Sequence, residues 1–235
     1  MFYYHRIFSD NKLNIIPFLL IITVDCLALS LAILLAVFSG LEPTHFMEEG
    51  EPITWFSAGQ LAAIGAIAAI VGAIRFRDRY SRKIPHASPW IWFFIATCFW
   101  FLGLDELQEI HESIDLWIHE LLNIDQSHLS DRLDDLVILL YGAVMGFVLY
   151  KNKRELKQFR QVWKLLKLGI YTAIAMVILD AITNQNDIIA SETVNEWVGT
   201  IEECFKIGAE GIFLSVSYYC LQIAKISSIS KLENN

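Results

Sequence analysis

Long apolar segments alternate with short polar ones along the whole chain. The apolar segments are residues 14–39, 54–74, 89–106, 134–150, 166–182 and 197–223. About 20 residues of helix cross a hydrocarbon core of about 30 Å, so each segment can span a bilayer if the shorter ones include flanking residues. Helices satisfy their own backbone hydrogen bonds, which lipid cannot do, and the alternating pattern of a membrane barrel is absent. The pattern predicts an all-α bundle of six transmembrane helices, forming a single transmembrane domain over residues 1–235.

Composition strengthens this prediction. Hydrophobic residues make up 55% of the chain and the mean hydropathy is +0.45. A soluble domain is usually nearer half apolar and lacks uninterrupted apolar blocks of this length. The first block is too long for the apolar region of a signal peptide and no A-x-A cleavage pattern follows it, so we expect it to be retained. The four cysteines have no metal-type spacing and are interpreted as packing residues.

The basic residues predict how the chain is oriented. Sixteen of the 18 Lys and Arg residues lie in the polar segments 6–12, 75–83, 151–167 and 225–231. With six crossings all four segments fall on one side, and the positive-inside rule then places both termini in the cytoplasm. In a bacterium this is the cytoplasmic (inner) membrane. Because orientation accounts for these charges, we expect membrane lipids as partners and no nucleic acid, while protein partners stay open.

The acidic residues gather on the opposite side, most densely at the end of the third helix. Asp105, Glu109 and Glu112 are spaced i, i+4, i+7 and share one helical stripe, which Asp115 and His119 continue. Residues 105–127 contain neither Gly nor Pro. We therefore expect the third helix to extend beyond the bilayer, or to be followed by an amphipathic segment on the outer surface.

Carboxylates stacked in this way suggest a cation site. They repel one another, and when partly buried they must bind a proton or a cation. Together with imidazoles they form a ligand set for a divalent metal such as Zn, Mn, Fe or Ca. The candidate metal ligands are Asp105, Glu109, His111, Glu112, His119, Asp135, Asp180 and Glu203. No HExxH is present and the third helix lacks the ExxH of di-metal bundles, because positions 108 and 116 are Gln and Leu. A proton-sharing network and a solvated acidic face therefore remain alternatives.

The last apolar segment carries a lysine among glutamates. Glu202, Lys206 and Glu210 are spaced i, i+4, i+8, and Glu203 precedes Lys206 by three residues. A lysine within a membrane helix needs an acidic partner, which these glutamates or Asp25 of the first helix can supply. The cluster is either an ion pair that lets the helix pack inward, or a functional group in which Lys206 tunes the pKa of the adjacent carboxylates or meets an anionic substrate.

Three short motifs carry a resemblance. EEGEPITW at the start of the second helix, LDE at the end of the third and the paired glutamates of the sixth resemble a group of uncharacterised six-span bacterial membrane proteins. That resemblance implies a fold and no activity. By analogy the chain is also comparable to the alkaline ceramidase and adiponectin-receptor group of intramembrane zinc hydrolases. It differs from them in having six helices and no His-xxx-His pair on the last one.

Three classes of function fit these observations. The first is a metal-dependent enzyme, such as a membrane hydrolase, acting on a lipid or lipid-linked substrate at the outer leaflet. Its predicted catalytic residues are Glu112, Glu203 and Lys206, with Glu112 or Glu203 as the general base. The second is a cation or proton-coupled transporter or channel, which predicts ionisable groups near the midplane and a route to the cytoplasm. The third is a non-catalytic sensor or assembly partner whose acidic face binds Ca²⁺ or a basic protein.

Overall fold

The computed structural model describes residues 14–48, 50–82, 88–108, 110, 113–114, 117, 119, 121, 133–183 and 191–232. Its long helices are α2 (Ile16–Phe38), α3 (Pro52–Arg82), α4 (Trp90–Gln108), α6 (Leu133–Lys151), α8 (Trp163–Thr183) and α9 (Glu192–Leu232). The short elements are η1 (His45–Met47), α7 (Lys153–Leu156) and η2 (Lys157–Val162). Over these ranges the secondary structure is helical and contains no strand, which confirms the predicted all-α class.

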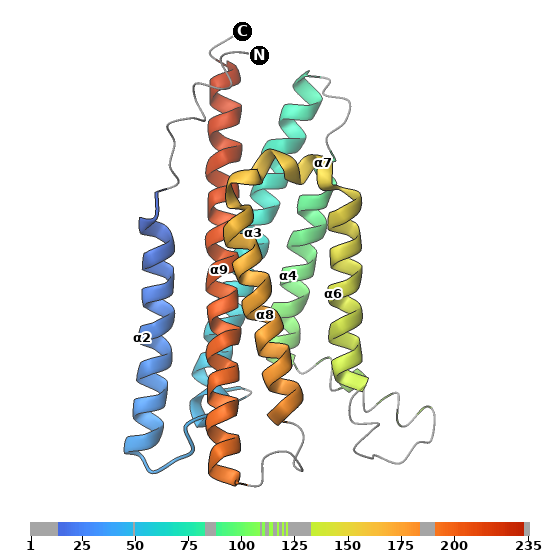
Figure 1. The fold of residues 1–235 in the computed structure, drawn as a ribbon. Helices are drawn as coiled ribbons and strands as arrows, with labels where there is room; N and C mark the ends of the chain where they lie inside the picture. Colours follow the sequence, from blue (N-terminus) through green and yellow to red (C-terminus); the bar gives the residue numbers. More distant parts are fainter. Residues whose placement is uncertain are drawn as a thin grey trace.

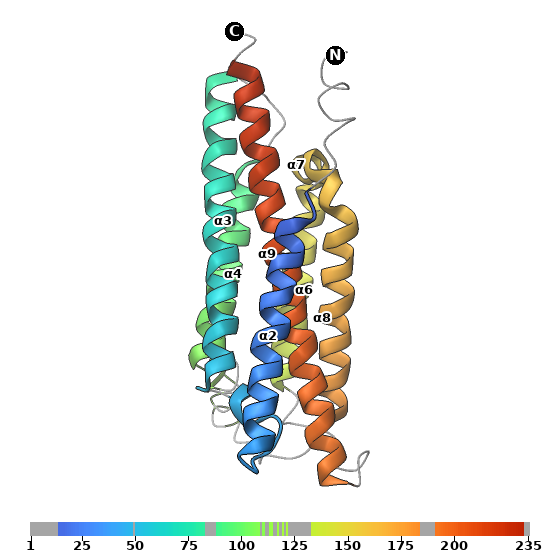
Figure 2. The same cartoon turned by 90° about the vertical axis from the view of Figure 1, so that its left-hand side faces the viewer.

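The long helices form an elongated bundle in which successive helices run in opposite directions (Figure 1). The first residue of α2 and the last residue of α9 therefore lie at the same end (Figure 2). We call this the basic end, because Arg75, the segment 151–167 and Lys225 lie there. We call the opposite end, which holds Glu42, Glu106 and Glu202, the acidic end. The alternation is the one that six apolar segments with short connections require.

Several helices are suited to a membrane. Five helices of the described part are long and apolar enough to cross one, and α6 contributes the shorter apolar stretch Leu140–Lys151. Large apolar side chains on α2 face outward, with Leu20, Leu27 and Phe38 exposed by 64%, 65% and 85%. Water would solvate such a surface poorly, whereas hydrocarbon covers it without penalty. The surface of the bundle is therefore that of a membrane protein.

Two helices run well past the apolar segments of the sequence. α3 continues from residue 74 to Arg82, and α9 continues from residue 223 to Leu232. At about 1.5 Å per residue, α9 is about 60 Å long, roughly twice the thickness of the hydrocarbon core. Hydropathy detects where a helix leaves the apolar layer, but the helix itself ends only where the backbone is interrupted. Neither extension contains Gly or Pro, so nothing in the local sequence stops it.

The end of α2 has a clear local cause. Gly40 has φ of 71°, a conformation that costs little only for glycine. Its N–H donates to the carbonyl of Val37 over 3.1 Å, and the N–H of Leu41 donates to the carbonyl of Ala36 over 2.9 Å. These two bonds form a Schellman motif, which satisfies the last carbonyls of α2 and turns the chain toward α3.

The largest apolar cluster fills the half of the bundle nearer the basic end. It is made of Ala68 and Val71 (α3), Ile91, Trp92 and Ala96 (α4), Phe159 and Val162 (η2), and Val216, Tyr219, Cys220, Ile223 and Ala224 (α9). The Trp92 and Phe159 rings meet edge to face with centroids 4.8 Å apart, joining α4 to η2. Smaller clusters centred on Ile64 and Ile207 lie nearer the acidic end, and the polar residues described below lie beside them.

Candidate functional site

Polar side chains from four helices meet inside the bundle, in the half nearer the acidic end. We call this group the polar ladder; it consists of Asp25 (α2), Ser57 and Gln60 (α3), Glu106 (α4), and Glu203, Lys206 and Glu210 (α9). The three residues on α9 are spaced i, i+3, i+7, so they share one face of that helix. They extend about 10 Å along its axis, at about 1.5 Å per residue.

The part of the ladder nearest the acidic end is centred on Lys206. Its Nζ lies 2.7 Å from Glu106 Oε1 and 3.2 Å from Glu203 Oε2. The side chains of Lys206, Glu106 and Glu203 are 22%, 16% and 19% exposed. Lys206 therefore has the acidic partner that its position in an apolar helix requires, and it connects α9 to α4.

Glu106 is a partner that sequence reasoning missed. Residue spacing on the sixth apolar segment pointed to glutamates of the same helix or to Asp25, and only Glu203 of that set forms an ion pair with Lys206. Glu106 belongs to the acidic group at the end of α4, but it was not among the candidate ligands or catalytic residues. Spacing along one helix does not indicate which residue of a neighbouring helix faces it, and this is why Glu106 could not be identified.

The part of the ladder nearer the middle of the bundle is more deeply buried. Glu210 Oε1 accepts a hydrogen bond of 2.8 Å from Ser57 Oγ, and Asp25 Oδ1 accepts one of 2.5 Å from Gln60 Nε2. All four residues are less than a tenth exposed. Any side chain at Gly211 would collide with the Asp25 carboxylate, so α2 and α9 approach closely here. The hydroxyl and the amide orient the two carboxylates without neutralising them.

Ser57 and Gln60 carried a weak signal in the sequence. They are three residues apart within an otherwise apolar segment and therefore lie on the same face of α3. Polar residues on one face of a membrane helix usually point into the bundle, because lipid offers them no hydrogen-bond partner. That pattern could have placed α3 against the acidic residues, although it could not have chosen Asp25 and Glu210 as the partners.

The charge balance of the ladder determines its chemistry. Four carboxylates (Asp25, Glu106, Glu203 and Glu210) are grouped with a single ammonium, that of Lys206. Uncompensated charges cost several kcal/mol or more in a medium of low dielectric, so the excess negative charge favours binding of protons or of a cation. Asp25 Oδ2 and Glu210 Oε2 are buried oxygens with no hydrogen-bond donor in the described part of the chain. These oxygens are available to such an ion.

Further carboxylates lie beyond the ladder, toward the acidic end of the bundle. Glu202 accepts a hydrogen bond of 3.1 Å from Thr183 Oγ1, which joins α9 to α8. Asp180, a predicted metal ligand, is half-buried one turn before Thr183 on α8. Among the described residues, carboxylates thus extend inward along α9 from Glu196, nearest the acidic end, through Glu202 and Glu203 to Glu210, the deepest.

The predicted metal ligands are only partly within the described residues. Asp105, His119, Asp180 and Glu203 are described; His119 is buried and Asp105 is half-buried. Glu109, His111 and Glu112 lie outside the described residues, and Asp135 lies in α6 with its side chain outside them. Among the side chains that are described, no three His, Cys, Asp or Glu are grouped to hold a metal ion.

Of the predicted catalytic residues, the structure places Glu203 beside Lys206, whereas Glu112 is not described. The predicted continuation of the third helix is helical at its described positions, from Ile110 to Leu121, and otherwise also lies outside them.

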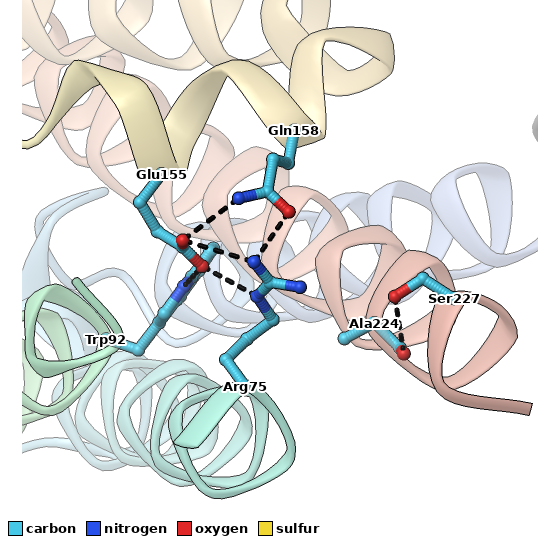
Figure 3. A network of polar contacts seen from close by, with 6 residues as sticks. All are labelled: Arg75, Trp92, Glu155, Gln158, Ala224 and Ser227. Carbon is cyan, nitrogen blue, oxygen red and sulfur yellow. Dashed lines mark hydrogen bonds and ion pairs between the residues drawn. The ribbon is translucent and has the colours of Figure 1, made fainter. Parts of the chain in front are cut away.

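A second polar network closes the basic end (Figure 3). Glu155 accepts hydrogen bonds from Arg75 Nε at 2.7 Å and from Trp92 Nε1 at 3.3 Å. Gln158 contacts both charged partners, accepting from Arg75 Nη2 at 2.5 Å and donating to Glu155 Oε2 at 3.1 Å. The Arg75 and Glu155 side chains are 4% and 0% exposed, so this ion pair is deeply buried, and both oxygens of Glu155 accept hydrogen bonds.

Sequence reasoning treated Arg75 only as a charge that orients the chain. The available signal was Glu155, the one acidic residue in the strongly basic segment 151–167. An isolated acid in such a segment indicates a specific partner, and Arg75, seven residues before the end of α3, is that partner.

These features define a polytopic helical membrane protein that encloses a ladder of ionisable side chains. The chain belongs to the family described as a domain of unknown function (DUF8692), whose match covers residues 13–221 and so includes every residue of the ladder. A family of unknown function agrees with the resemblance to an uncharacterised group. Neither a curated protein nor a solved structure matches the chain.

Proposed function

We propose that the protein is a cation or proton-coupled membrane transporter or channel, and that the polar ladder binds the coupling ion. The observation that carries this proposal is the charge balance, in which four carboxylates are grouped with the single ammonium of Lys206. Inside a membrane, ionisable residues mark ion or substrate pathways by default. A site with excess negative charge attracts a proton or a metal cation.

The depth of the ladder supports the same proposal. Asp25 lies near the middle of the 23-residue α2. Its carboxylate packs against Gly211, the residue that follows Glu210 on α9. Transporters place their ion sites near the bilayer midplane, where access can be switched from one side to the other. The sequence-based prediction for this class was ionisable groups near the midplane and a route to the cytoplasm, and the positions of Asp25 and Glu210 support the first part.

The apolar cluster between the ladder and the basic end supports a state that is accessible from the acidic end. Val71, Trp92, Val216 and Tyr219 belong to this cluster, and the Arg75–Glu155 pair closes it at the basic end. Transport requires a second state in which α9 shifts relative to α3 and α4, opening this half. A helix shift of this kind is a common form of conformational switching.

We also infer the orientation from the charges, with both termini in the cytoplasm and the acidic end outside. The segments 75–83 and 151–167 lie at the basic end together with the start of α2 and the end of α9. Short loops rich in Lys and Arg stay in the cytoplasm during insertion. The coupling ion would then enter the ladder from the outside.

Electrical recording on a solid-supported membrane tests the proposal without knowledge of a transported substrate. The protein in proteoliposomes is exposed to steps in pH, Na⁺, K⁺ or Ca²⁺. An ion that enters a site partway across the membrane displaces charge, so we expect a transient current with one of these ions. Glu210→Gln should reduce that current at least about tenfold, since it removes one buried charge. Glu42→Gln, at an exposed position outside the ladder, is the matched control and should not.

The absence of a transient with all four ions, from protein that is folded and inserted, would overturn the proposal. The remaining candidates would then be the other two classes, the outer-leaflet enzyme and the non-catalytic sensor. One observation favours the enzyme as the second candidate. Among the described residues, the ladder extends from the middle of the bundle not toward the basic end but toward the acidic end. There Glu203 could act as a general base and Lys206 could meet an anionic lipid head group, with a divalent metal held by the predicted ligands of the third helix.

A further inference from the structure

We propose that the segment 151–167 binds the head groups of anionic phospholipids in the leaflet at the basic end. We call this segment the basic arc; it includes the last residue of α6, all of α7 and η2, and the start of α8. The proposal is independent of the function assigned to the polar ladder, because it depends on different residues at the opposite end of the bundle.

The basic arc has one buried face and one charged face. Glu155, Phe159 and Val162 are 1%, 3% and 3% exposed, so they form the side of the arc that packs on the bundle. The exposed residues include Lys151, Lys153, Arg154, Lys157, Arg160, Lys164 and Lys167. An amphipathic segment with basic residues on its exposed face is typical of a surface that lies in the head-group region of a membrane.

The basic side chains start from fixed positions. Glu155 is held by Arg75 of α3 and by Trp92 of α4, and Phe159 packs against the same tryptophan. In Figure 1 the arc crosses the bundle from the end of α6 to the start of α8, and α3 and α9 extend beyond it. Fixed positions reduce the entropy that is lost when a ligand binds, so these cations are better prepared for a head group than a free loop would be.

The positive charge on the exposed face of the arc is not neutralised by any residue that the structure describes. Its one acidic residue, Glu155, is occupied by Arg75. None of the seven exposed basic residues forms an ion pair with a described residue; Lys151 and Lys153 instead lie over the rings of Phe147 and Tyr150, at 5.3 and 4.4 Å. Orientation by the positive-inside rule explains why such charges face the cytoplasm. It does not require them to be held together on a buried support.

The surroundings of the arc identify a lipid as the source of the anion. Tyr150 and Trp163 are 65% and 39% exposed and flank the charged residues. Exposed aromatic side chains beside cations are typical of the boundary between hydrocarbon and head groups. At that depth the anions are lipid phosphates, each of which comes with the acyl chains that cover the apolar side chains. Each basic residue near an anionic surface contributes about fivefold to binding.

Native mass spectrometry of the whole protein, released from nanodiscs of equal phosphatidylglycerol and phosphatidylcholine, tests the proposal. We expect wild type to retain phosphatidylglycerol preferentially. The variant Lys157→Gln/Arg160→Gln/Lys164→Gln should weaken that retention by about 100-fold, as three residues at about fivefold each predict. Lys225→Gln, at an exposed position of α9 outside the arc, is the control and should reduce it by no more than about fivefold.

Two results would overturn the proposal. One is a wild-type protein that retains the two lipids equally, and the other is a triple variant that keeps the wild-type preference. The melting temperature of each variant in phosphatidylcholine alone is measured in parallel. All three substituted side chains are exposed and have no ion-pair partner in the described part of the chain, so unfolding is not expected to explain a loss of lipid.

Discussion

The Nζ of Lys206 lies 2.7 Å from Oε1 of Glu106, so an ion pair between α9 and α4 holds together the part of the polar ladder nearest the acidic end. Glu203 completes the group on the other side of the ammonium at 3.2 Å. A cation in this position determines how many of the surrounding carboxylates can stay charged. Stability and ion binding should therefore both depend on Lys206.

Replacement of Lys206 should show this dependence. Lys206→Met leaves Glu106 and Glu203 close together without a cation, and we expect a loss of about 2–3 kcal/mol, less than for a fully buried pair because a fifth of the side chain is exposed. At about 2–4 °C per kcal/mol, the melting temperature should fall by about 4–12 °C. Adding Glu106→Gln should recover part of the loss. If the two effects simply add, the residues are not coupled and the geometry at Lys206 is contradicted.

A substitution at Gly211 tests the part of the ladder nearer the middle of the bundle without removing a polar group. In Gly211→Ala the new methyl group displaces the Asp25 carboxylate, and overpacking of this kind costs about 1–3 kcal/mol. Gly208→Ala is the matched control on the same helix, since its Cβ would only touch Thr172 Cγ2 at 4.0 Å. We expect a lower melting temperature for the first variant and little change for the second. Equal effects would show that α2 and α9 do not meet at Asp25.

The Arg75–Glu155 pair should be essential for anchoring the basic arc. Glu155→Gln leaves the Arg75 guanidinium buried without a counter-charge, which typically costs about 3–5 kcal/mol. Thermal unfolding should shift downward by at least about 6 °C, and limited proteolysis should become faster between α6 and α8. The pair Arg75→Met/Glu155→Leu should recover much of the stability, because no unpaired charge remains. A Glu155→Gln protein as stable as wild type would exclude this network.

Labelling of single cysteines tests the orientation. In a background without the four native cysteines, Lys225→Cys lies at the basic end and Glu42→Cys at the acidic end, both at exposed positions. A membrane-impermeant maleimide added to intact cells should label residue 42, and residue 225 should react only after the membrane is opened. The reverse pattern would place the basic end outside, against the positive-inside rule.

Metal content tests the enzyme alternative on the third helix. Plasma mass spectrometry of detergent-purified protein compares wild type with Glu112→Ala/His119→Ala. The alternative predicts close to one divalent metal per chain in wild type and its loss in the variant. If neither protein contains metal after purification without chelators and incubation with metal, proton-linked transport and partner binding remain. Metal that persists in the variant would place the site on other residues.

The fold was largely predictable because a membrane imposes a simple rule on sequence. Each helix must present about 20 apolar residues, so the segments 14–39 and 166–182 are visible as the cores of α2 and α8. The basic segments alternate with the acidic ones as the helices change direction. Hydropathy does not encode where α3 and α9 end, because both continue into polar sequence beyond the apolar layer.

The site was predictable only in part, because its contacts are between helices. Lys206 and Glu203 were identified from their spacing on one helix, and the structure places them together. Glu106, Ser57 and Gln60 reach the site from other helices, and their contribution depends on helix rotation and packing that no local pattern specifies. The predicted ligands Glu109, His111 and Glu112 lie outside the described residues, so the proposed metal site on the third helix stays a prediction.

In the proposed function, the ladder binds an exchangeable ion at Glu210 and its neighbours. Infrared difference spectroscopy of the protein in lipid, with the acidic end exposed to buffer of varied pH and to D₂O, tests it most directly. If the ion is a proton, the carbonyl band of a protonated carboxylic acid should appear, shift in D₂O and vanish in Glu210→Gln. If it is a metal cation, the carboxylate bands should shift when that cation is added and not in the variant. Spectra of wild type and Glu210→Gln that respond identically to pH and to every cation would show that Glu210 binds no exchangeable ion.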